Sequence, residues 1–388
     1  MTTELVGDNA QMLAIADAVG WPYEVKHLTF SGLNRFHFRF LGPSLHKVDP
    51  ETASTLTPPW PDLILATARR CTPVAFWLRE QSGGRAKIVF VGQMWADPQR
   101  FDLFVTTPQY HQPSGPNVYP LQLPMLFPNP DKVRSAATSW EPHLKHLPRP
   151  WIVVFVGGPT GPHVLNPSVA RDLMDQSMAL VERDGGSLLV STSRRTPDAV
   201  CEILEQSMPK NGLFYRWTSD SRGNPFHALL GLGDRFVVTG DSMSMLVEAV
   251  RQGKPLAIFQ LPLRRRKWLK RLRNRLRDTL LSPQAIARHQ RRARVGIGLV
   301  NLGLLSYRRD FSMLYQGLIE RDLAQPLEQW LGPQPAGDDE ASGRSGPTRT
   351  TAAPDERSHL RARIRALIEP PPADDTAEAA PSADQPAE

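Results

Sequence analysis

The sequence predicts an α/β protein made of two Rossmann-like parallel-sheet domains that face a cleft, followed by a disordered C-terminal tail. Between Trp151 and Pro262, five short apolar runs alternate with four helical segments, which is the pattern of a parallel sheet covered on both faces. Residues 1–148 carry a weaker version of the same alternation, and 388 residues are enough for two domains.

In the first domain, residues 1–148, apolar spacing predicts helices at 8–20 and 72–84. Strands are expected at 23–30, 61–68, 86–92, 101–107 and 117–123. Residues 125–150 are rich in proline and polar groups and are predicted to connect the two domains. A domain of this kind begins with an interior strand, so the expectation is a very short first strand or a chain that starts late as given.

The second domain, residues 149–332, begins with the apolar run at 151–158. Asn166 as a cap and Pro167 in the first turn predict the next helix, which glycines end. Further strands are expected at 187–193, 213–217, 235–240 and 255–259, with helices at 196–208, 224–233 and after Gly240. A helical segment at 311–331 completes the ordered part.

The cysteines Cys71 and Cys201 have no metal-binding spacing around them, and neither do the histidines. We therefore expect neither a disulfide framework nor a metal, and no bound cofactor. The first residues lack the pattern of a signal peptide, and no apolar run reaches the roughly 18 residues of a membrane span. These features predict a cytoplasmic protein whose membrane contact, if any, is peripheral.

Charge is unevenly distributed along the chain. Residues 333–388 hold 11 acidic and 6 basic residues, a net charge of −5. Since the whole chain has a net charge of +7, residues 1–332 carry a net charge of +12. With 9 prolines and few apolar groups, this tail is predicted to be disordered, apart from a short helix at 355–369.

Nine of the fourteen residues from 264 to 277 are basic, and leucines recur there at helical spacing. We predict a basic amphipathic helix over 264–280 that binds an anionic membrane. A solvated face is the alternative, and nucleic acid is disfavoured because no aromatic series accompanies the arginines. The predicted membrane-binding residues are Arg264, Arg265, Arg266, Lys267 and Trp268.

Three polar junctions follow strands of the second domain, where ligands collect in open parallel sheets. Glycines allow close approach of the backbone, hydroxyls donate to phosphate, and arginines neutralise its charge. Together they predict an anion site, although each can instead be a turn, a solvated arginine pair or a helix cap. The residues are Gly157, Gly158, Ser193, Arg194, Arg195, Gly240, Asp241, Ser242 and Ser244.

Glu248 lies six residues after Ser242, about one and two-thirds helical turns along. From there its carboxylate can accept hydrogen bonds from a ribose or sugar hydroxyl, or it can simply face solvent. GxGxxG and GxxxxGK[ST] do not occur at the expected strand ends, which disfavours a nicotinamide site and a P-loop.

Three segments, "GGPTGPHVLN", "GGSLLVSTSRRTPDAV" and "NPFHALLGLGDRFVVTGDSMSMLVEAVRQGKPLAIF", carry a resemblance. Together they resemble the mitochondrial-fission-type family of bacterial and plant proteins, which are grouped with glycosyltransferases. More distantly, "GGPTG" and the helix from Ser242 to Glu248 are similar to the second domain of two-domain (GT-B) glycosyltransferases. That resemblance implies that the N-termini of helices bind the diphosphate of a nucleotide-sugar. It implies that Ser242 and Ser244 contact this diphosphate and that Glu248 binds the ribose.

The resemblance implies sugar transfer from a nucleotide-diphosphate donor, used as substrate, to a lipid-linked or envelope glycan acceptor at the inner membrane face. Asp8 is the candidate for the base that deprotonates the acceptor, although it can equally cap the helix after it. Two other functions stay open: a non-catalytic membrane-associated scaffold, and a nucleotide-sugar epimerase.

Overall fold

The computed structural model describes most of the chain. The described residues are 1–3, 6–31, 42–93, 98–110, 115–160, 162–220, 223–264, 268–282, 291–301, 305, 310–331 and 356–369, with the backbone alone at 6–8, 268–271, 273 and 301.

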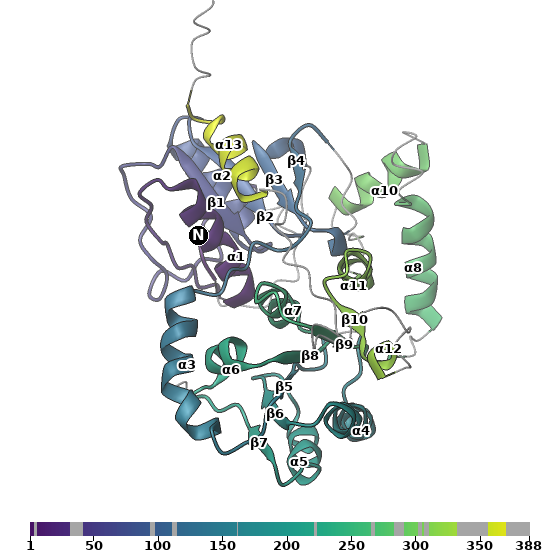
Figure 1. Ribbon diagram of the computed structural model, residues 1–388. Coiled ribbons are helices and arrows are strands. Elements are labelled where there is room, and N and C mark those ends of the chain that lie inside the picture. The colour runs from purple at the N-terminus through teal and green to yellow at the C-terminus, as the bar shows by residue number, and fades with distance from the viewer. Residues whose placement is uncertain are drawn as a thin grey trace, which may run out of the picture.

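The first domain is built on a parallel sheet with strand order β1-β2-β3-β4 (Figure 1). Alternate residues of β2 face opposite sides: Ile88 and Phe90 pack with α2, whereas Val89 and Val91 pack with α1. The elements are α1 (Val6–Val19), β1 (Leu63–Thr67), α2 (Cys71–Gln81), β2 (Lys87–Val91), η2 (Pro98–Arg100), β3 (Leu103–Thr106), η3 (Pro108–Tyr110) and β4 (Val118–Pro120).

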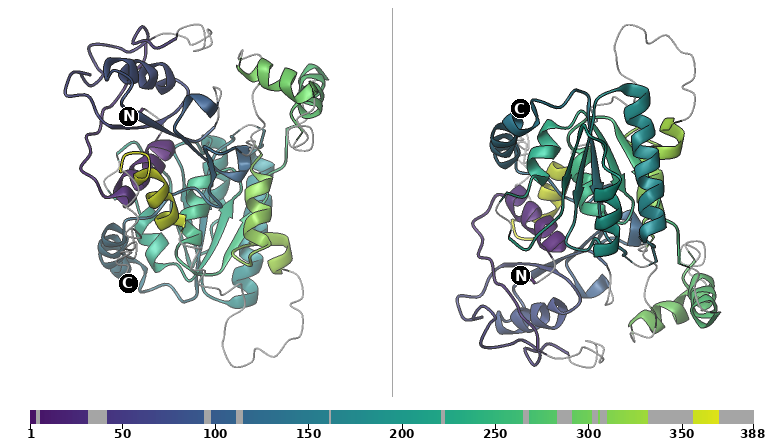
Figure 2. Two further views of the ribbon diagram at one scale, coloured as in Figure 1. Left: turned by 90° about the horizontal axis from the view of Figure 1, so that it is seen from above. Right: turned by 90° about the horizontal axis from the view of Figure 1, so that it is seen from below.

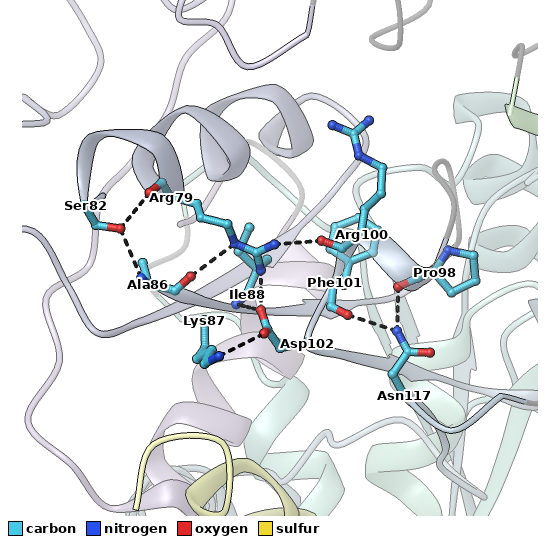
Figure 3. A network of polar contacts seen from close by, with 10 residues as sticks. All are labelled: Arg79, Ser82, Ala86, Lys87, Ile88, Pro98, Arg100, Phe101, Asp102 and Asn117. Carbon is cyan, nitrogen blue, oxygen red and sulfur yellow. Dashed lines mark hydrogen bonds and ion pairs between the residues drawn. The ribbon is translucent and has the colours of Figure 1, made fainter. Parts of the chain in front are cut away.

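Arg79 ties the end of α2 to the edge of this sheet where the strands begin (Figure 3). Its Nε donates to the carbonyl oxygen of Ala86 at 3.1 Å and its Nη1 to that of Arg100 at 3.0 Å, and it pairs with Asp102. The Asp102 carboxylate also accepts from the N–H of Ile88 at 2.8 Å. This network therefore has a structural role at the edge opposite the carboxyl ends of the strands.

The second domain is built on a six-stranded parallel sheet with strand order β10-β9-β8-β5-β6-β7. Val153 and Phe155 of β5 face the core shared with α6, α7 and α11, whereas Ile152 and Val154 face α4, α5 and α12. The elements are β5 (Trp151–Val156), α4 (Pro167–Asp184), β6 (Ser187–Thr192), α5 (Asp198–Gln206), β7 (Gly212–Tyr215), α6 (Phe226–Leu232), β8 (Arg235–Thr239), α7 (Met243–Val250), β9 (Leu256–Phe259), β10 (Gln325–Pro326) and α12 (Leu327–Leu331). The predicted α/β class with two parallel sheets is confirmed.

The strand predicted at 23–30 is wrong for the described residues. Within this segment the backbone makes only isolated bridges, from His27 to Thr2 and from Phe30 to Val48. Its apolar alternation suits a strand, but a strand also needs a partner along its length, and Thr2 pairs with it only around one residue.

The predicted connection at 125–150 contains a helix, α3 (Pro130–Leu144). The Asn129 side chain caps it by accepting from the N–H groups of Asp131 at 3.0 Å and Lys132 at 3.1 Å, and Pro130 occupies its first position. Leu144 is fully buried in the core of the second domain, so α3 packs with that domain, against α6.

Four further helices complete the description: α8 (Trp268–Leu280), α10 (Arg291–Asn301), α11 (Ser312–Ile319) and α13 (Glu356–Arg365). The helix predicted near the C-terminus is confirmed as α13, which lies against α1. Both views of Figure 2 show α8 and α10 standing apart from the two sheets. Residues 333–354 and 370–388, predicted to be disordered, lie outside the described residues.

Candidate functional site

The three polar loops of the second domain lie at one edge of its sheet. β5 pairs in parallel with both β6 and β8, so the carboxyl ends of these three strands are neighbours. Gly157 follows β5, Ser193 follows β6 and Gly240 follows β8. The sheet order therefore brings together loops that are up to about 80 residues apart in the sequence.

The loop after β5 is held by the segment after β8. The N–H of Gly157 donates to Thr239 Oγ1 at 2.8 Å, and the N–H of Gly158 donates to Asp241 Oδ2 at 2.7 Å. A Cβ on Gly157 would lie 2.4 Å from Asp241 Oδ2, and one on Gly158 would lie 2.2 Å from the carbonyl oxygen of Arg195. Only glycine allows so close an approach.

The loop after β6 is fastened by Thr196. Its Oγ1 accepts from the N–H of Ser193 at 2.9 Å and donates to the carbonyl oxygen of Gly157 at 2.5 Å. The guanidinium of Arg195 donates to Thr160 Oγ1 and lies 3.8 Å from Asp241 Oδ2. Arg195 therefore lies over the junction of the three loops.

Arg194 differs from Arg195 in its surroundings. Both side chains are exposed, but no described contact joins Arg194 to the other two loops. Of the predicted arginine pair, the structure brings only Arg195 into the cluster.

Asp241 is a carboxylate almost without access to solvent, at 2% exposure. Burial raises its pKa, and the N–H of Gly158 and the positive charge of Arg195 oppose this rise. Among the described residues its Oδ1 has no hydrogen-bond partner, and neither has the hydroxyl of Tyr315. That hydroxyl lies 2.8 Å from where a Cβ on Gly240 would be, and burial and the charge of Asp241 raise its pKa, so it stays protonated.

Among the described residues, no side chain caps the start of α7. Ser242 is the N-cap residue, but its side chain makes no capping hydrogen bond, and the Asp241 carboxylate holds Gly158 instead. The capping interpretation of this junction is therefore wrong. Ser242 is buried and Ser244 half-buried, one on each side of the first helical residue, Met243.

Glu248 is half-buried on α7. Burial raises its pKa from 4.5 to about 7. Among the described residues, its carboxylate has neither a hydrogen bond nor an ion pair to compensate. The carboxyl group therefore changes its charge near neutral pH, and its oxygens can accept hydrogen bonds from a ligand.

Two sets of predicted residues are described only in part. Asp8 lies inside the first turn of α1, which begins at Val6, so it is not the N-cap; its side chain is outside the described residues. Arg264 is exposed, Trp268 opens α8 with its backbone alone described, and 265–267 lie outside the description.

Sequence reasoning missed four residues of this cluster: Thr160, Thr196, Thr239 and Tyr315. The first three stand within the polar junctions, so a count of strand-end hydroxyls could have found them. Tyr315 comes from α11, far along the chain, and carries no local signal.

A cavity of about 530 Å³ lies elsewhere, in the first domain, with Trp21, Tyr23 and Trp60 among its lining residues. None of the residues of the strand-end cluster lines it. Within the described part of the chain, no group of three or more histidine, cysteine or acidic residues could hold a metal ion, and no helix is long and apolar enough to cross a membrane.

The fold and this cluster define an α/β protein of two parallel sheets with polar loops at one strand edge. The chain belongs to the mitochondrial fission ELM1 family, whose model matches residues 6–290.

Two relatives match shorter segments. The mitochondrial fission protein ELM1 of Arabidopsis thaliana is 33% identical over 126 residues, which cover 32% of this chain and 29% of that protein. The uncharacterized protein RP120 of Rickettsia prowazekii (strain Madrid E) is 28% identical over 132 residues, covering 34% and 37%. The chain thus spans about a third of the length of these relatives.

Likeness to solved structures is weak. WaaG, a glycosyltransferase involved in lipopolysaccharide biosynthesis, has a TM-score of 0.36 and 11% identity, over 81% of this chain and 95% of that one. A Listeria monocytogenes protein provisionally named UDP-N-acetylglucosamine 2-epimerase has a TM-score of 0.39 and 12% identity, over 79% and 74%. At such scores no activity is transferred to this chain.

Proposed function

We propose that the protein transfers a sugar from a nucleotide-diphosphate donor to a lipid-linked or cell-envelope glycan acceptor. In this proposal the donor is a substrate, no metal takes part, and the reaction takes place on the cytoplasmic side of the inner membrane.

The uncapped start of α7 supports this proposal most directly. The first N–H groups of a helix together carry about half a positive charge. Asp241 and Ser242 are both placed to cap these groups, yet neither does; the Oδ2 of Asp241 holds Gly158 instead. An incoming phosphate can satisfy the helix start in their place.

The surrounding groups suit a diphosphate. Gly157 and Gly158 let the backbone come close to a ligand, and Ser242 and Ser244 supply hydroxyl donors. The guanidinium of Arg195 supplies positive charge where the leaving diphosphate would gain negative charge.

Glu248 suits the ribose. Its carboxylate has no partner in the described part of the chain, so hydrogen bonds from two hydroxyls would stabilise the charged form and lower its raised pKa. Such a contact distinguishes a nucleotide-sugar from a simple phosphate.

The acceptor hydroxyl would need a base as it attacks the anomeric carbon and the bond to the diphosphate breaks. Asp8, on α1 of the first domain, remains the candidate for that base.

A non-catalytic scaffold is the second candidate, favoured by membership of a family described by mitochondrial fission. A scaffold should keep its function when Ser242 and Glu248 are replaced, whereas a transferase should lose it. An epimerase, in contrast, should convert a nucleotide-sugar without any acceptor.

A thermal-shift screen against UDP-, GDP-, CMP- and TDP-sugars tests the proposal. A ligand at 100 times its dissociation constant stabilises by about 2.7 kcal/mol, which is a shift of several degrees for a domain of this size. A rise with one nucleotide family supports donor binding, and the absence of any shift across the set opposes it.

A further inference from the structure

We propose that α8 and α10 form a basic bridge between the two domains and that the outer face of this bridge docks on an anionic lipid surface. This proposal does not depend on sugar transfer and holds equally for a scaffold.

The bridge starts in the second domain, close behind the loop that follows β5. The N–H of Val164 donates to the carbonyl oxygen of Pro262 at 2.9 Å, and the N–H of Arg264 donates to that of Pro162 at 2.8 Å. His163 and Leu263 form a β-bridge between these two bonds. The segment that leads into α8, residues 262–264, is therefore held by backbone hydrogen bonds next to the candidate site.

The bridge ends in the first domain. Val300, in the last turn of α10, is 3% exposed and belongs to the core cluster of that domain, together with Phe90 and Phe104. Leu281, directly after α8, packs against the same cluster. Figure 1 shows the two helices along one flank of the molecule.

The two helices pack closely on each other. A Cβ on Gly296 of α10 would lie 2.8 Å from Leu281 Cδ2 and 2.9 Å from Leu280 Cβ. The pair is therefore a packed unit anchored at both ends, which can present one side as a stable surface.

The exposed side chains of this pair combine leucines and arginines. Between residues 264 and 301 the sequence holds 13 lysines and arginines and one acid, Asp278, which pairs with Arg277 at 2.9 Å. Leu272 and Leu276 are 59% and 51% exposed and, four residues apart, share one face of α8. Val295 of α10 is 57% exposed. The exposed arginines among the described side chains are Arg264, Arg275, Arg291, Arg292 and Arg294.

This combination fits a lipid surface better than a nucleic acid. Arginines attract anionic headgroups, and exposed aliphatic side chains gain by insertion among the acyl chains. A phosphodiester backbone has no apolar region in which the aliphatic side chains could be buried. Stacking on bases needs aromatic rings, and Trp268 is the only aromatic residue of α8 and α10.

Sedimentation of the full-length protein with vesicles of rising phosphatidylglycerol content tests the proposal. Binding should grow with the anionic fraction. The triple variant Arg275→Glu, Arg291→Glu and Arg294→Glu should bind at least about tenfold more weakly, since each cation near the surface contributes about a fivefold factor. The matched control, Arg134→Glu, Lys145→Glu and Arg171→Glu, changes the net charge equally at exposed positions on or next to α3 and α4 and should bind nearly like the wild type.

A second variant tests the apolar part of the face. Leu272→Ser with Leu276→Ser keeps the charge and, because both side chains are exposed, should keep the circular dichroism spectrum while binding several-fold more weakly. Wild-type protein that fails to sediment with strongly anionic vesicles at low salt overturns the proposal. Equal binding by the two triple variants, or binding of single-stranded RNA in place of vesicles, overturns it as well.

Discussion

The carboxylate of Asp241, which follows β8, accepts a 2.7 Å hydrogen bond from the backbone N–H of Gly158, which follows β5. This bond joins two neighbouring strand ends and fixes the distance between their loops. It directs the Asp241 carboxylate toward Gly158, and α7, which follows, has no side-chain capping hydrogen bond at its N-cap residue.

Asp241→Ala should destabilise the protein by about 1 to 3 kcal/mol, because it leaves the buried N–H of Gly158 without an acceptor. Ser242→Ala should cost less than about 0.5 kcal/mol, below the roughly 1 kcal/mol of a working N-cap, because Ser242 makes no capping bond. Urea denaturation of both variants compares them, and a larger loss for Ser242→Ala would contradict this interpretation.

Gly158→Ala should cost about 1 to 3 kcal/mol, since its Cβ would meet the carbonyl oxygen of Arg195 at 2.2 Å. Gly317→Ala is the matched control: it lies in α11 with nothing within 4 Å of an added Cβ, and should be neutral or stabilising. Melting temperatures of the two variants measure the difference. Similar values would mean that the loop can move away from Arg195 at little cost.

Glu248 should make stability depend on pH in a direction that Glu248→Gln removes. Its folded-state pKa of about 7 lies above the ordinary 4.5, so its contribution is fully present below pH 4.5 and is lost as the pH rises toward 7. The free energy of unfolding of the variant, relative to the wild type, should therefore be about 3 kcal/mol higher at pH 8 than at pH 4.5. Denaturation at the two pH values tests this, and a constant difference would show an ordinary, solvated carboxylate.

The sequence predicts the second domain well because its strands are continuous apolar runs bounded by caps and glycines. Asn166 and Pro167 mark the start of α4, and the polar junctions stand where each strand ends. Since parallel strands share one carboxyl edge, their sequence positions suffice to place Gly158, Arg195 and Asp241 in one cluster.

Other features depend on contacts that no local pattern carries. The alternation at 23–30 suggests a strand, but whether it pairs depends on its neighbours. Tyr315 reaches the cluster from α11, which lies far along the chain. Of the two neighbouring arginines, only Arg195 has a described contact with another loop, and their sequence positions alone do not distinguish them. The raised pKa of Glu248 follows from tertiary burial, which helical position alone does not give.

Helix α13 should contribute to the stability of the first domain although it lies near the end of the chain. Leu360 and Ile364 are 1% and 0% exposed and pack with Ile15 of α1. Leu360→Ala should cost about 2 to 4 kcal/mol through lost burial and the cavity left behind. Ile368→Ala, at a residue 37% exposed, is the control and should cost less than half as much. Chemical denaturation measures both, and a neutral Leu360→Ala would detach α13 from the fold.

Isothermal titration of nucleotide-diphosphate sugars into the wild type and Glu248→Gln tests the donor site most directly. Glu182→Gln, on an exposed helical glutamate of α4, is the control for the same chemical change. The proposed site predicts measurable wild-type binding, roughly tenfold or greater weakening in Glu248→Gln, since a hydrogen bond to a charged group contributes about 1.5 to 3 kcal/mol, and no change in Glu182→Gln. Failure of every nucleotide-sugar to bind the wild type, or equal affinity in the wild type and Glu248→Gln, would contradict it.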